Sequence, residues 1–235
     1  MKRLSTYIAF TAMSILCSGS GSHAQDLAAD MKFMYDVLKN PTSLHVVVEA
    51  LIITDDDNGG LEQSREHTEI KIKNGKYMCI GKDFDMLIND KHIVMVQKNT
   101  QEILYSRNDG AYVKKQQSDM STLPYMAKPE VNDDIIYHGI KDGFKHYTII
   151  NSKGVIKKGD LWFDAETGFL KKTEYEYTPE SSLGGSRAIS EFKIINPKAE
   201  LNDSDFSETI YVDLTGNVVK PATRYKLFKL THIEI

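Results

Sequence analysis

Residues 69–80 read Glu-Ile-Lys-Ile-Lys-Asn-Gly-Lys-Tyr-Met-Cys-Ile, and this stretch decides the fold class. Asn74-Gly75 stands between two runs of strand-forming residues, and this dipeptide is the strongest short signal for a tight β-hairpin. The runs Glu69–Lys73 and Lys76–Ile80 are therefore predicted to be antiparallel neighbours.

Strand signals continue on both sides of this hairpin. The run Leu44–Thr54 before it is rich in β-branched residues, and the polar run 55–60 separates the two as a loop. The spacing of the later runs predicts a meander of short antiparallel strands. These predicted strands are Phe84–Ile88, His92–Gln97, Glu102–Ser106, Ile135–Gly139, Phe144–Ile150, Val155–Asp164, Phe169–Tyr177 and Arg187–Ile195, with two short closing strands near Ile210 and at Tyr225–Leu230.

One amphipathic helix is predicted before the strands, over Asp26–Lys39. Apolar side chains such as Leu27, Met31 and Leu38 recur there at helical spacing on one side. Asn40 precedes a proline, which disfavours the helical conformation and ends the helix.

The first 24 residues are typical of an export signal. A positive start is followed by the apolar run Leu4–Leu16, which is short for a membrane span. Small residues at Ser22 and Ala24 predict cleavage after Ala24, leaving 25–235 as a single periplasmic or secreted domain. The alternative is a lipid anchor on Cys17, which would tether the chain to a membrane.

The strand pattern breaks between Arg107 and Asp133. This stretch contains two prolines, and Leu123-Pro124-Tyr125-Met126 is typical of a short helix or flap. Long insertions in compact domains are often lids. We expect Leu123, Tyr125 and Met126 to belong to a lid, and the alternative is a surface loop.

Several predicted strands carry apolar side chains on both faces, among them Phe84–Ile88 and His92–Gln97. Such a strand needs two covers, and the helix supplies only one. A lid or an apolar ligand is the other cover, unless the chain fills the space with its own side chains. The candidate lining residues of an apolar cavity are Met86, Ile88, Ile93, Met95, Leu104, Trp162 and Phe192.

Signals for chemistry are absent from the sequence. The formal charge is −4, and no basic stretch favours nucleic acid. The histidines are scattered singly, no Cys or His pair has zinc spacing, and no nucleophile elbow or phosphate loop occurs. We therefore expect no metal, no cofactor and no catalytic residue. Cys79 is expected to be a small buried hydrophobe.

The order of elements resembles the periplasmic lipoprotein carriers of the LolA/LolB-like superfamily. The similar features are the helix Asp26–Lys39, the strand Leu44–Thr54, the hairpin 69–80, the segment Gly159–Lys172 and the ending Ser190–Pro197 followed by Asp205-Phe206. Carriers of this family often place an Arg-Pro pair after the early hairpin, and this chain has Lys73-Asn74-Gly75-Lys76-Tyr77 in that region.

The resemblance implies an α+β, mainly antiparallel fold: an incomplete barrel or strongly curved sheet with an N-terminal helix and a mid-chain lid or loop insertion. It also implies a non-enzymatic protein that holds lipid, or the acyl chains of a lipoprotein, in an apolar cavity. The alternative function is a cell-envelope interaction module with a self-filled core and a protein partner.

Overall fold

The computed structural model describes residues 22–39, 41–55, 61–108, 133–151, 155–181, 184–216 and 218–234. The predicted lid residues Leu123, Tyr125 and Met126, and most of the predicted export signal, lie outside these ranges.

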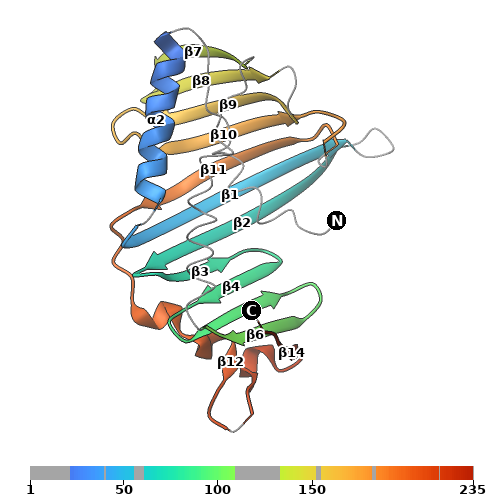
Figure 1. Ribbon diagram of the computed structural model, residues 1–235. Coiled ribbons are helices and arrows are strands. Elements are labelled where there is room, and N and C mark those ends of the chain that lie inside the picture. Colours follow the sequence, from blue (N-terminus) through green and yellow to red (C-terminus); the bar gives the residue numbers. More distant parts are fainter. Residues whose placement is uncertain are drawn as a thin grey trace. The chain divides into compact units, whose positions relative to one another are not determined.

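One α-helix precedes a series of strands in the described chain (Figure 1). The elements are α2 (Ser22–Leu38), β1 (Ser43–Asp55), β2 (Leu61–Lys73), β3 (Lys76–Ile80), β4 (Phe84–Ile88), β5 (His92–Gln97), β6 (Glu102–Arg107), β7 (Asp133–Lys141), β8 (Phe144–Asn151), β9 (Ile156–Asp164), β10 (Leu170–Tyr177), β11 (Arg187–Asn196), the 3-10 turns η1 (Asp203–Phe206), η2 (Glu208–Ile210) and η3 (Thr223–Tyr225), and the short strands β12 (Val212–Asp213), β13 (Lys220–Pro221) and β14 (Lys229–His232).

In the described residues, twelve strands are hydrogen-bonded in the order β14-β6-β5-β4-β3-β2-β1-β11-β10-β9-β8-β7, which is open at both ends. The mainly antiparallel, unclosed sheet with an N-terminal helix confirms the predicted fold class. The hairpin of β2 and β3 is confirmed as well: Asn74 and Gly75 have φ of 49° and 81°, the left-handed conformation that its tight turn requires.

Two details differ from the sequence prediction. β2 begins at Leu61, eight residues before the predicted start. The predicted closing strands are instead 3-10 turns joined to very short strands, and β14 runs parallel to β6 rather than antiparallel. No alternation of polar and apolar residues marks these short elements, so their period was not visible in the sequence.

The chain divides into two compact units. Of the described residues, the helix unit comprises 22–39, 48–55, 61–67, 133–151, 155–181 and 184–195, and the C-terminal unit comprises 41–47, 68–108, 196–216 and 218–234. β1 and β2 are each divided between the two units: β1 after Val47 and β2 after His67.

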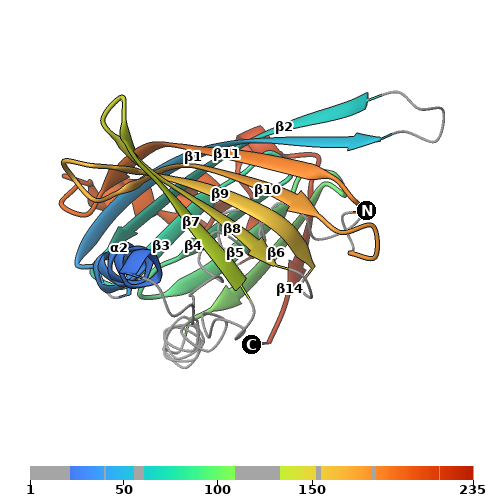
Figure 2. The same ribbon diagram turned by 90° about the horizontal axis from the view of Figure 1, so that it is seen from above.

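In the helix unit, α2 lies on one face of the strands β8–β11 (Figure 2). Its apolar side bears Leu27, Met31 and Met34, all buried. Asp30 on the same helix accepts hydrogen bonds from Lys145 Nζ at 2.7 Å and from the Tyr147 hydroxyl at 2.9 Å, both on β8. The expected amphipathic helix therefore covers one face of this part of the sheet.

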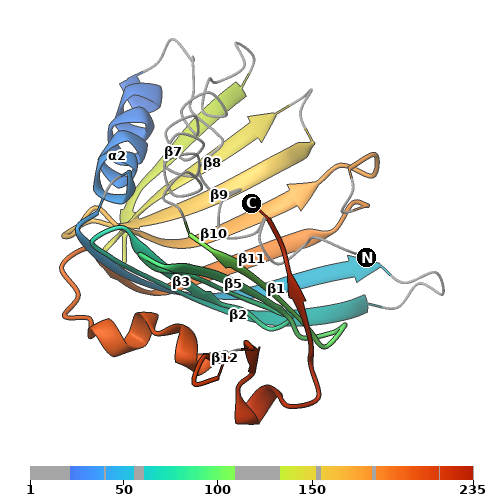
Figure 3. The same cartoon turned by 60° about the horizontal axis from the view of Figure 1, so that its bottom comes forward.

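In the C-terminal unit, residues 201–216 and 218–228 form a segment that lies against one face of β3–β6 (Figure 3). We call it the C-terminal segment. Its buried side chains Phe206, Tyr211 and Val212 pack on apolar side chains of the strands. The strand residues of this core are Met78, Leu87, Val94, Val96, Ile103 and Tyr105.

Candidate binding face

The opposite face of β3–β6 carries a second set of apolar side chains. The strand register places Cys79 opposite Met86, Met86 opposite Met95, and Met95 opposite Leu104. Cross-strand partners share a face of a sheet, so these four side chains form one row across four strands. Since Leu87 and Val94 lie in the core beneath the C-terminal segment, this row lies on the other side.

A shorter row runs beside the first. Ile88 is opposite Ile93, two residues along from Met86 and Met95 respectively, so all four share the face. Ile88 and Ile93 are 2% and 1% exposed, while Met95 and Leu104 are partly exposed. Five of the seven candidate lining residues thus lie together on this apolar face.

The remaining two candidates lie in the helix unit, on opposite faces of its sheet. Phe192 is buried on the face that α2 covers, two residues from Ser190, which pairs with Thr173. Trp162 lies on the other face: its ring stacks on His146 at 4.5 Å, and Lys172 Nζ lies 4.6 Å from its centroid. These two side chains therefore do not line a common surface.

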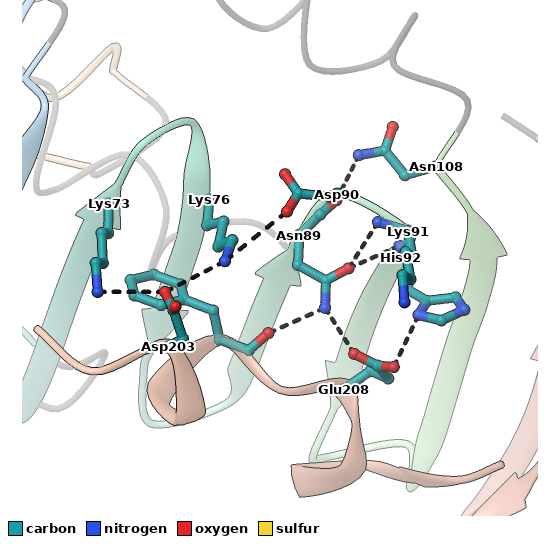
Figure 4. Close-up of polar contacts among 10 residues, drawn as sticks. Lys73, Lys76, Asn89, Asp90, Lys91, His92, Asn108, Asp203 and Glu208 are labelled. Carbon is teal, nitrogen blue, oxygen red and sulfur yellow. Dashed lines mark hydrogen bonds and ion pairs between the residues drawn. The ribbon is translucent and has the colours of Figure 1, made fainter.

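Polar contacts of Asn89, His92 and Glu208, which we call the clasp, join the C-terminal segment to the turn between β4 and β5 (Figure 4). Asn89, in the turn between β4 and β5, donates to the carbonyl of Phe206 at 3.0 Å and to Glu208 Oε2 at 2.7 Å. Its side-chain oxygen accepts the backbone N–H groups of Lys91 and His92 at 2.9 and 2.8 Å. One buried amide therefore joins the turn and the segment.

Glu208 is the charged member of this clasp. Its second oxygen lies 3.1 Å from His92 Nδ1. Partial burial raises the pKa of Glu208, but hydrogen bonds from its own backbone N–H and from Asn89, together with the electrostatic interaction with His92, outweigh burial and hold the pKa below its ordinary value. The carboxylate is therefore ionised at neutral pH.

Two lysines lie beside the clasp, both on the same side of it, in Figure 4. Lys73 and Lys76, on either side of the Asn74-Gly75 turn, lie 3.2 and 3.3 Å from Asp203 Oδ1. Asp203 is largely exposed, so these pairs contribute little to stability. They bring the start of the C-terminal segment to the end of the hairpin.

A cluster that sequence reasoning missed lies in the helix unit. The rings of His138 and His146 stack, with their centroids 4.4 Å apart. Asp160 accepts hydrogen bonds from Thr148 at 2.6 Å and from Lys158 at 2.7 Å. Asp160 also pairs with His146 Nε2 at 3.0 Å. Thr148 also pairs with His138 Nε2 at 2.8 Å.

A bulge at Gly139, which has φ of 86°, brings these histidines together. The two-residue Asp142-Gly143 turn alone would put His138 opposite Tyr147, on the face away from His146. The shift of register between Tyr137 and Ile140 moves it by one residue. The glycine was the only sequence signal of this bulge.

The described residues contain no group of three or more side chains with metal-ligand geometry. In the same ranges, no helix is both long and apolar enough to cross a membrane.

No protein-family model matches the chain, and no curated protein matches it. Similar solved structures include members of the superfamily that the sequence resembles. A putative outer membrane lipoprotein-sorting protein domain from Vibrio parahaemolyticus matches at 9% identity and a TM-score of 0.33, over 77% of this chain and 96% of that one. A LolA superfamily protein from Nitrosomonas europaea matches at 12% identity and 0.30, over 81% and 100%.

The MucA/MucB complex structure from Pseudomonas aeruginosa also matches, at 11% identity and a TM-score of 0.43, over 77% of this chain and 60% of that one. At such identities and scores these likenesses concern strand arrangement alone, and no inference about ligand or partner is taken from them.

Proposed function

We propose that this chain is an exported, non-enzymatic binding protein that holds lipid, or the acyl chains of a lipoprotein, on the apolar face of β3–β6. The observation that carries the proposal is the pair of apolar rows on this face, which is separate from the core beneath the C-terminal segment. The export signal predicted for residues 1–24 supports a periplasmic or secreted location.

The chemistry of the face suits an acyl chain. Its side chains are aliphatic or thioether, and methionine adapts to irregular apolar surfaces, as Met86 and Met95 would to a flexible guest. Each methylene removed from water contributes about 0.8 kcal/mol, so six to eight methylenes supply roughly 5–6 kcal/mol without any polar contact. The partly exposed Met95 and Leu104 are where the guest would make its first contacts.

A matched pair of variants tests the proposal. Leu104 and Leu230 lie on the neighbouring strands β6 and β14, both are partly exposed, and they belong to opposite faces. Leu104→Gln should weaken binding of a fluorescent fatty acid by about tenfold, since the guest loses contact worth about 1.4 kcal/mol. Leu230→Gln should leave the affinity unchanged while lowering stability.

Equal affinity of both variants would place binding elsewhere, and no uptake of fatty acid by the unmodified protein would remove the proposal. Native mass spectrometry of protein purified from its own cell envelope should show bound mass that organic solvent removes. Recovery of empty protein alone would contradict the proposed function.

A second candidate is a cell-envelope interaction module with a protein partner. The observation that favours it is β7, which ends the strand order, together with the exposed isoleucines Ile136 and Ile140 on that strand. An end strand can pair with an added strand of a partner. Crosslinking from a photoreactive residue at position 136 should capture one stoichiometric envelope protein, and recovery of monomer alone would count against this candidate.

A further inference from the structure

An open groove of about 500 Å³ crosses four neighbouring strands of the helix unit, β2, β1, β11 and β10 (Figure 1). Lys172 and Glu191 line it, and along their strands they alternate with Thr173 and Phe192, which lie on the face that α2 covers. The groove therefore lies on the face away from the helix. Its volume is in the range of small-molecule sites, about 300–1,000 Å³.

The middle of the groove carries an excess of negative charge. Glu49 on β1 and Glu191 on β11 both line it, and both pair with a single lysine. Lys193 donates a hydrogen bond to Glu191, and its Nζ lies 3.5 Å from Glu49 Oε2. Two carboxylates thus share one ammonium group. The partly exposed side chains of Leu51 and Ile189 supply an apolar surface on the same two strands.

One wall of the groove carries a positive charge from Arg65 on β2. In the described part of the chain, its guanidinium group has no hydrogen bond or ion pair with another residue. Its charge still reaches across β1 to Glu191. The Lys193 hydrogen bond is the main cause that holds the pKa of Glu191 below its ordinary value, burial acts weakly against it, and Lys172 and Arg65 also lower that pKa.

The opposite wall, on β10, is positive as well. Lys172 Nζ lies 3.3 Å from Glu174, and Arg187 donates a hydrogen bond to the same carboxylate. Two cations thus share one carboxylate. In the strand order, the negative middle of the groove stands between two positive walls. An anion alone would meet the carboxylates and a cation alone would meet the walls, whereas a molecule that carries both charges complements the groove.

We propose that this groove is a binding site for a zwitterion, a small molecule whose ammonium group and carboxylate or phosphate group lie a few bonds apart. Arg65 binds the anionic group, Glu49 on the neighbouring strand binds the ammonium group, and Leu51 and Ile189 contact the apolar part of the ligand. A short peptide and a phosphoethanolamine head group share this chemistry. The site is separate from the apolar face of β3–β6 and does not depend on the proposed function.

Calorimetric titration at low ionic strength gives the first test. The probes are alanyl-alanine, its N-acetyl derivative, its C-terminal amide and glycerophosphoethanolamine. Acetylation removes the positive charge and amidation removes the negative charge, so each should weaken binding of the dipeptide by about tenfold. Tighter binding of glycerophosphoethanolamine would identify a lipid head group as the ligand, and tighter binding of the dipeptide would identify a peptide. Equal affinity of the dipeptide and its two capped forms, or no binding of either zwitterion at millimolar concentration, would overturn the proposal.

Variants of the whole protein give the second test. Arg65→Gln should weaken alanyl-alanine binding by about tenfold and leave its amide unaffected, because the amide has no carboxylate for Arg65 to bind. Glu49→Gln should likewise weaken the dipeptide and leave the N-acetyl form unaffected. The control is Lys157→Gln, which removes a cation that lies outside the groove and should change neither affinity. All three side chains are exposed, so the melting temperature should not change.

The pattern across probes and variants decides the assignment. If Arg65→Gln weakens the dipeptide and its amide equally, Arg65 does not hold the carboxylate and the proposal is wrong. Leu104→Gln, in the C-terminal unit, should weaken binding of a fatty acid and leave the affinity for zwitterions unchanged. Failure of the groove and failure of the apolar face can therefore be told apart.

Discussion

Removal of the Asn89 side chain should loosen the C-terminal segment from its sheet. Asn89 is 8% exposed and its amide makes four hydrogen bonds, two donated to the segment and two accepted from its own turn. In Asn89→Ala all four are lost, and the carbonyl of Phe206 and the carboxylate of Glu208 lose their donor.

The expected cost follows from these bonds. A bond between neutral groups contributes about 1 kcal/mol net, and one to a charged group about 1.5–3 kcal/mol. Water reaching the truncated turn would recover part of this total. We therefore expect Asn89→Ala to lower the free energy of unfolding of the C-terminal unit by about 3 kcal/mol.

The assay must report on the C-terminal unit itself. The chain has one tryptophan, Trp162, and it lies in the helix unit, so tryptophan fluorescence does not follow the segment. Hydrogen exchange does: amides of residues 206–211 should exchange about 100-fold faster in Asn89→Ala, as 3 kcal/mol of lost local stability requires.

The control is Asn196→Ala. Asn196 is exposed and its side chain accepts a single local bond from the Lys198 backbone N–H at 3.0 Å. Its removal should change stability by less than about 0.5 kcal/mol. If exchange in residues 206–211 is the same in both variants, the clasp does not hold the segment and the reasoning is wrong.

Two further predictions concern pH. Burial raises the pKa of Tyr147 and Tyr211 above the ordinary 10, so the stability that these two tyrosines contribute is present below pH 10 and is lost as the pH rises above it. Absorbance at 295 nm should therefore show tyrosinate appearing together with unfolding. Titration of all tyrosines before the protein unfolds would contradict this prediction. Burial raises the pKa of Asp160, but hydrogen bonds from Lys158, Thr148 and His146 outweigh burial and lower the pKa below 3.8. The stability that the Asp160 carboxylate contributes is therefore present above pH 4 and is lost as the pH falls. In Asp160→Asn the free energy of unfolding, measured by urea denaturation at a series of pH values, should fall less steeply at acid pH, and an unchanged pH profile would refute the role of that carboxylate.

The strands were predictable because their signals are local. The turn at Asn74-Gly75 determines its own hairpin, and the runs between later turns match β4–β11 within a few residues. The two apolar faces of β4 and β5 could also be predicted. Five of the seven candidate residues share one of these faces, and their role in lining a binding site stays a prediction.

The rest depended on register and on distant packing. Strict alternation along Phe169–Tyr177 would put Phe169 on the same face as Tyr175. A register shift between Leu170 and Lys172 puts Leu170 on that buried face instead, and no sequence signal marks the shift. The pairing of Asn89 with residues more than one hundred positions away carries no local pattern, so the C-terminal segment was not recognised as a cover.

The place of β1 in the strand order has a consequence for biogenesis. β1 ends at Asp55, whereas its neighbour β11 begins at Arg187, so the ribosome must add more than 130 residues before that edge is paired. Until then the nascent chain exposes a long β-branched segment that is prone to stick to copies of itself. A holdase chaperone that shields this segment should raise the yield of native protein, and slow translation without one should favour inclusion bodies.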